Sequence, residues 1–110
     1  MAKSTKGYAG GLRGHNGRSL LQRLGLRDQI QRASVSIMAN IAEGFGRHSD
    51  KEFANFLSFA HASVSEAQSH IYVALDLQYI SEGTFRDLYE LFDEISRMTR
   101  ALAVHLRSAK

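Results

Sequence analysis

The chain has 110 residues, of which 44% are hydrophobic and 23% charged, and it contains no cysteine and no proline. This length allows one domain and is too short for two, and the composition is typical of a globular protein. The lack of cysteine excludes disulfide frameworks and thiolate metal sites. No apolar run of about 18 residues occurs, so we expect no membrane span. The N-terminus has basic residues but no apolar h-region, so we expect no secretory signal and predict a cytoplasmic protein.

The net charge of +3 is unevenly distributed along the chain. Residues 1–23 contain five basic residues and no acid, which gives +5, whereas residues 24–110 contain nine basic and 11 acidic residues, which gives −2. A basic segment attached to a nearly neutral domain indicates contact with a polyanion. A solvated segment that only improves solubility is the alternative.

Residues 1–17 hold five of the nine glycines and few apolar side chains. Because glycine loses much backbone entropy on ordering, we predict a flexible segment over residues 1–23 and a helical domain over residues 24–110. The stretch from Ser19 to Leu24 can form one helical turn, but a helix that short is not stable alone.

The first predicted long helix covers about residues 26–45. Its apolar residues recur at a helical spacing. Val35 and Met38 belong to a second apolar face, which indicates a helix buried between neighbours. Gly44 and Gly46 are expected to end the helix in the left-handed conformation that glycine tolerates. The main apolar stripe consists of Leu26, Ile30, Ala33, Ile37, Ile41 and Gly44.

Two further helices are predicted, over residues 50–79 and 82–107. Ser49 followed by Glu52 forms a capping-box pattern at the start of the second helix, and Ser81 is the expected N-cap of the third. Because short connections join three long amphipathic helices, the helices must pack antiparallel, up-down-up. The sequence therefore predicts an all-α bundle.

No constellation in the sequence predicts catalysis, a metal site, a cofactor or a small-molecule substrate. The acids Glu90, Asp93 and Glu94 fit the solvated face of a helix, and nothing marks the pocket that a catalytic carboxylate pair needs. No two histidines are four residues apart, as a helical metal pair requires. The five histidines are His15, His48, His61, His70 and His105.

Basic residues gather at the first predicted turn and in the N-terminal segment, where they are candidates for contacts with nucleic acid. A solvated turn is the alternative interpretation of the first group, since charged turns are common. The predicted contacts are Arg32, Arg47, His48 and Lys51 near the turn, and Arg13, Arg18 and Arg23 in the segment.

The stretch from Gln29 to Gly44 resembles the signature of the 23S rRNA intervening-sequence protein family, a bacterial family of four-helix bundles also labelled ribosomal-protein-like. A Gln-Ile-x-Arg-Ala-x-x-Ser-Ile pattern begins at Gln29, and Asn-Ile-Ala-Glu-Gly begins at Asn40. The stretches from Lys51 to Leu57 and from Leu77 to Ile80 are also similar to the family. The resemblance covers about residues 24–107.

The resemblance implies a bundle that assembles as a ring, commonly a pentamer. It also implies kinship with the accessory protein of diversity-generating retroelements, and hence binding of nucleic acid and of a reverse transcriptase or another ribonucleoprotein partner. The family's first helix should precede Leu24, where this chain has its glycine-rich segment. We therefore expect three helices and a groove, filled by another copy or a partner helix and lined by residues such as Val35, Met38, Phe59 and Leu77.

Three functional hypotheses follow. The first is a non-enzymatic, oligomeric helical scaffold that binds RNA or a ribonucleoprotein partner. The second is a protein-binding helical adaptor without nucleic-acid contact, and the third is a truncated copy with no independent function. Salt-dependent RNA binding distinguishes the first from the other two, because phosphate contacts weaken steeply with salt.

Overall fold

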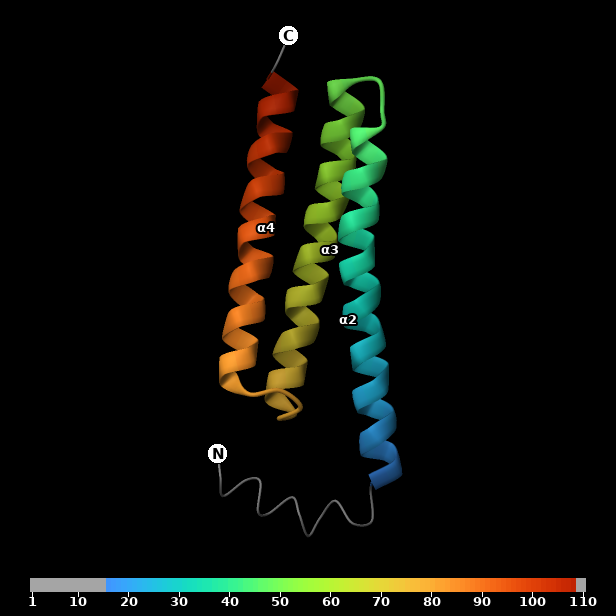
Figure 1. The fold of residues 1–110 in the computed structure, drawn as a ribbon, viewed down its shortest axis with the longest axis vertical. Coiled ribbons are helices and arrows are strands. Elements are labelled where there is room, and N and C mark those ends of the chain that lie inside the picture. The colour runs from blue at the N-terminus through green and yellow to red at the C-terminus, as the bar shows by residue number, and fades with distance from the viewer. Residues whose placement is uncertain (1–15, 109–110) are drawn as a thin grey trace.

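The computed structural model describes residues 16–108, which form three α-helices and no strand. The helices are α2 (Asn16–Phe45), α3 (Asp50–Asp76) and α4 (Glu82–Ser108). They run up, down and up, with α3 between α2 and α4 (Figure 1). The predicted all-α architecture is confirmed. The expected absence of the family's first helix before Leu24 is not confirmed, because residues 16–23 are helical as the start of α2 and residues 1–15 lie outside the described range.

Helix α2 begins at Asn16, so the predicted start near residue 26 is wrong, and residues 16–23 are helical rather than part of a flexible segment. Residues 1–15 lie outside the described part of the chain. The short stretch after Ser19 is helical because it extends a long helix and needs no nucleation of its own. The turn after α3 also contacts it, since the Tyr79 hydroxyl donates to Gln22 Oε1 at 3.4 Å.

The turn between α2 and α3 is only partly as predicted. Ser49 is the N-cap of α3, and its hydroxyl accepts the Glu52 backbone N–H at 3.1 Å. The predicted left-handed glycine cap is wrong, because no glycine in residues 16–108 has a positive φ. Gly44 is still helical, and a Cβ atom there would lie 2.7 Å from Phe56 Cβ. Glycine at this position therefore allows α2 and α3 to approach each other closely.

The turn between α3 and α4 begins earlier than predicted, because α3 ends at Asp76 rather than near residue 79. Gln78 adopts a left-handed φ of 63° in this turn. The predicted N-cap of α4 is confirmed, since the Ser81 hydroxyl accepts the Thr84 backbone N–H at 3.0 Å.

Helix α3 carries most of the core. The backbones of α2 and α4 both pack on α3 and do not approach each other. Ala33 and Ile37 of α2 and Phe92 of α4 pack on the buried face of α3, as the apolar stripes predicted. The buried apolar residues of α3 are Ala54, Leu57, Ala60, Val64, Ala67, Ile71 and Ala74.

The three helices form a thin layer. The Cα trace measures 63 × 23 × 12 Å, and the shortest of these dimensions is about the diameter of one helix. An arrangement this thin leaves much apolar surface exposed. None of the helices in the described part combines the length and the hydropathy needed to cross a membrane.

Candidate functional site

The predicted basic patch at the α2–α3 turn is electrically almost neutral. Arg47 Nη2 pairs with Glu43 Oε2 at 2.7 Å, while His48 and Lys51 are exposed. The turn carries two cations and three acids, so its net charge is −1 when histidine is neutral. The cations are Arg47 and Lys51, and the acids are Glu43, Asp50 and Glu52. The turn alone therefore offers no strong field for a polyanion.

The other predicted basic residues do not join that patch. Arg32 lies 15 residues before Arg47, which is about 22 Å along α2, and it pairs with Asp28 at 2.9 Å. The Arg23 guanidinium lies 4.8 Å from the Tyr79 ring centroid, near the other end of the molecule. The two remaining predicted residues have no described side chain: Arg13 and Arg18.

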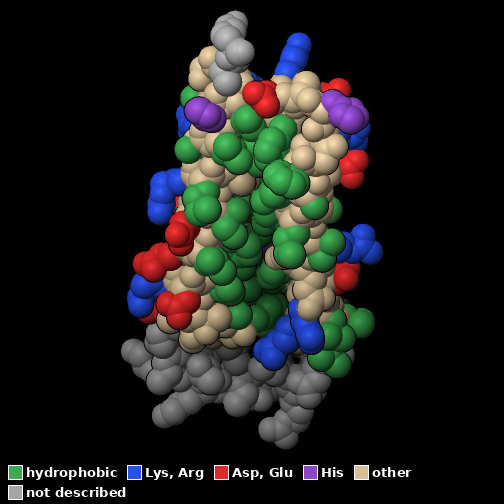
Figure 2. Space-filling view, turned by 45° about the horizontal axis from the view of Figure 1, so that its top comes forward, with side chains coloured by type: hydrophobic (Ala, Val, Ile, Leu, Met, Phe, Trp, Pro, Cys, Tyr) green, Lys and Arg blue, Asp and Glu red, His purple; other side chains and the backbone are tan. Residues whose placement is uncertain are grey.

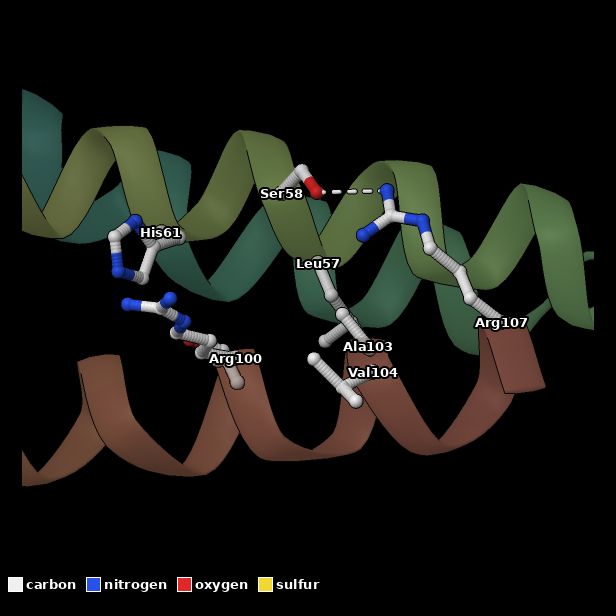
Figure 3. Close-up of a pocket in the computed structure, with 8 residues that line it drawn as sticks. Leu57, Ser58, His61, Arg100, Ala103, Val104 and Arg107 are labelled. Carbon is white, nitrogen blue, oxygen red and sulfur yellow. Dashed lines mark hydrogen bonds between the residues drawn. The ribbon is translucent and has the colours of Figure 1, made fainter. Parts of the chain in front are cut away.

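A second cationic site, which the sequence analysis missed, lies in a cleft between α3 and α4 (Figure 3). The cleft has a volume of about 250 Å³, and its charged or titratable lining residues are His61, Arg100 and Arg107. Arg107 Nη2 donates to Ser58 Oγ at 3.0 Å, and the side chains of Arg100 and His61 point toward each other in Figure 3. No acidic residue lines the cleft.

The sequence carries a signal for this cleft. Within residues 16–108, Arg32, Arg47 and Arg97 each pair with an acid four residues earlier. Arg100 and Arg107 have no acid three or four residues away in either direction, and they are seven residues apart. That spacing places both guanidinium groups on one face of a helix without a local counter-ion.

An apolar groove runs between α2 and α4 on the opposite side of the layer from this cleft. Figure 2 shows hydrophobic side chains along the hollow, with α4 on its left and α2 on its right. The groove is defined by floor residues Ile30, Ile41, Leu88 and Ile95, which are partly buried against the core, and by exposed rim residues Met38, Leu91, Met98 and Leu102.

Helix geometry explains which exposed residues border the groove. Met98 is 62% exposed and lies about 160° around α4 from Arg100, which faces the cleft. Of the four residues that the sequence analysis expected to line the groove, Met38 alone borders it. Val35 lies about 160° around α2 from Ile37, and two other expected residues lie about 140° around α3 from the buried Val64. Those two are Phe59 and Leu77.

The residues of the family-like signature are used in packing α2 on α3. Ser36 Oγ and Ser63 Oγ form a hydrogen bond of 2.8 Å between the helices, and Asn40 Nδ2 donates to the Ser36 carbonyl at 2.8 Å. Gly44 allows the close approach to Phe56. Among the described residues, no group of three or more His, Asp or Glu side chains could hold a metal ion.

Comparison with known protein families gives a match over most of the chain. The family model described as "23S rRNA-intervening sequence protein" matches residues 17–101, from the first turn of α2 to the last two turns of α4. No curated protein and no solved structure gives a significant match.

Proposed function

Because the chain belongs to the 23S rRNA-intervening sequence protein family, we propose that it is a non-enzymatic, oligomeric helical scaffold that binds RNA or a ribonucleoprotein partner. Its signature residues pack α2 on α3, which supports a structural rather than a catalytic role. We also propose that it acts in the bacterial cytoplasm, a compartment that fits a chain without cysteine.

The observation that carries the oligomeric part of the proposal is the α2–α4 groove. Met38, Leu91 and Met98 are 71%, 52% and 62% exposed on its rims. Soluble monomers rarely expose a continuous apolar strip of more than a few hundred Å². A surface of this kind needs a partner, and we assign that place to a second copy of the chain.

The charges beside the groove favour a second copy. Helix α2 carries Arg23 and Arg27 along its edge, whereas α4 carries Asp87 and Glu94 three or four residues from the apolar rim residues. No ion pair in residues 16–108 involves any of these four side chains. One edge of the groove is therefore positive and the other negative.

A two-fold axis parallel to the helices brings these edges together. Since α2 and α4 run in the same direction, such an axis lays α2 of each copy against α4 of the other. Arg27 of one copy then faces Asp87 of the second copy, and the apolar rims meet between these charges. This isologous arrangement closes both grooves with one self-complementary interface. The ring that the family resemblance implies would add further copies to such a unit.

The RNA-binding part of the proposal is supported by the five basic residues in residues 1–23. Assembly displays each set of charges at least twice on one particle. When several weak contacts act on one RNA, the effective concentration raises the overall affinity without any new contact.

Light scattering of the purified chain, with and without total RNA and at increasing salt concentrations, tests the proposal. We expect a particle larger than one chain whose mass increases with RNA at low salt. Binding should decrease linearly on a log–log plot against salt, with a slope of about −0.7 for each phosphate contacted on a single strand. A chain that never binds RNA would support the adaptor hypothesis instead.

A variant with Lys3→Gln, Lys6→Gln and Arg13→Gln serves as the matched comparison, because it keeps the three helices and removes three positive charges. Its particle mass without RNA should equal that of the natural sequence, while its salt slope should become less steep. An unchanged slope would show that these three residues do not contact RNA.

A further inference from the structure

We infer that the α3–α4 cleft, lined by His61, Arg100 and Arg107, binds a phosphate group of an RNA backbone. This inference rests on the proposed RNA-binding function and gives it a specific site. None of the three residues was among the contacts that the sequence analysis predicted. The cleft lies at the end of the molecule where α4 terminates and α3 begins (Figures 1 and 3).

The first argument is that the cleft holds positive charge without compensation. Across residues 16–108, no ion pair involves His61, Arg100 or Arg107. The nearest pair along this face of α4 is Arg97 with Asp93, which neutralises itself. Two guanidinium groups that line one cleft repel each other, so an anion bound beside them lowers the electrostatic energy.

The second argument is that one of the guanidinium groups is held in place by neutral partners. Arg107 Nη2 donates to Ser58 Oγ at 3.0 Å and to Ala54 O and Asn55 Oδ1, each at 3.4 Å. These acceptors fix the side chain and leave its charge intact. The Nε and Nη1 groups make no hydrogen bond within the described part of the chain, and the Ser58 hydroxyl proton is free to donate. The site therefore presents several oriented donors to one anion.

The third argument concerns the shape of the ligand. The cleft is open and follows two helices, and apolar side chains of Leu57, Ala103 and Val104 line it beside the basic groups. Arg100 and Arg107 are seven residues apart, which is about 10 Å along one face of α4. Two cations spaced along apolar carbon suit an extended sugar–phosphate chain.

The test uses the full chain and a fluorescent uridine oligoribonucleotide, with anisotropy measured over a range of salt. The double variant Arg100→Gln with Arg107→Gln should bind about tenfold more weakly or worse, and Arg100→Gln alone about fivefold, as expected for exposed charge pairs. The salt slope should become less steep by about 0.7 for each lost phosphate contact. Arg86→Gln is the matched control, because it removes the same charge from the same face of α4 about 21 Å away.

Arg107 contacts α3, so its replacement could also loosen the fold. Arg100 makes no hydrogen bond or ion pair within residues 16–108, and Arg100→Gln should therefore keep the natural melting temperature. The NMR signals of the His61 ring, assigned with His61→Gln, give a second measurement that does not depend on stability. They should shift when the oligonucleotide binds.

The outcomes separate this inference from the proposed function. If the natural chain binds RNA while the Arg100 and Arg107 variants bind equally well and His61 does not shift, the cleft is not the site, although the scaffold proposal stands. If no RNA binds, pyrophosphate is added instead. A shift of the His61 signals would then support a site for phosphate that RNA does not occupy. If the signals do not shift, the cleft is not a phosphate site. Competition by polyglutamate as strong as that by polyuridylate would overturn phosphate as the ligand class in favour of an acidic protein.

Discussion

The α2–α3 interface and the α2–α4 groove use the same helix in opposite ways. At the interface, small residues let two helices approach closely, and Ser36 Oγ and Ser63 Oγ form a hydrogen bond of 2.8 Å. At the groove, large apolar residues such as Met38 and Met98 lie exposed, at 71% and 62%. The contrast teaches that the family signature specifies how the helices of one chain pack, while the remaining apolar surface is the place where we propose that a second chain binds. Predictions about stability therefore concern the interface, and predictions about assembly concern the groove.

The largest effect on stability is expected for Ile37→Asp. Ile37 is 4% exposed in the main core, and an unpaired charge there should cost about 4 kcal/mol or more, a large part of the stability of a small domain. The variant should be unfolded by circular dichroism. Ala39→Asp is the control on the exposed side of α2 and should fold. Unchanged melting of Ile37→Asp would show that this stripe is not the core.

Two glycines of α2 should respond to alanine with opposite signs. A Cβ atom at Gly44 would lie 2.7 Å from Phe56 Cβ and 2.9 Å from Phe53 Cδ1, whereas nothing lies within 4 Å of one at Gly25. Gly44→Ala should destabilise the fold by about 1–3 kcal/mol through overpacking, and Gly25→Ala should stabilise it by about 0.5–1 kcal/mol through helix propensity. Urea unfolding measures both. Equal effects at the two positions would contradict the close approach.

The hydrogen bond between Ser36 and Ser63 should have a smaller effect. Ser36→Ala removes the partner of Ser63, which is only 9% exposed, and one of the two contacts of Asn40. We expect a loss of about 1 kcal/mol. Adding Ser63→Ala should restore part of that loss, because removing both partners leaves no unsatisfied hydroxyl between the helices. A double-mutant cycle with strictly additive effects would show that the bond contributes nothing.

The sequence predicted well what depends on one helix at a time. Periodicity identified Ile37 and Ala33 as core residues, and cap chemistry placed the starts of α3 and α4 at Ser49 and Ser81. The start of α2 was misplaced, because a flexible segment was inferred from glycine content, although helix continuation from residue 24 backwards costs no nucleation.

What depends on the register between helices was not predicted. The role of Gly44 follows from its distance to Phe56, which lies on another helix. To predict the cleft, one must know that His61 of α3 and Arg100 of α4 lie on facing sides of these two helices. For the same reason Phe59 was placed in the groove, although only the rotation of α3 decides on which face it lies.

The most direct test of the central claim, that a second copy covers the α2–α4 groove, is analytical ultracentrifugation at micromolar concentration. We predict that the natural chain sediments as a dimer or a larger particle, and that Met98→Glu shifts it toward the monomer and increases the binding of a hydrophobic dye. Phe59→Glu should leave assembly unchanged, because Phe59 is similarly exposed at 55% but lies on the outer face of α3. A well-folded natural monomer that binds no hydrophobic dye would contradict the claim.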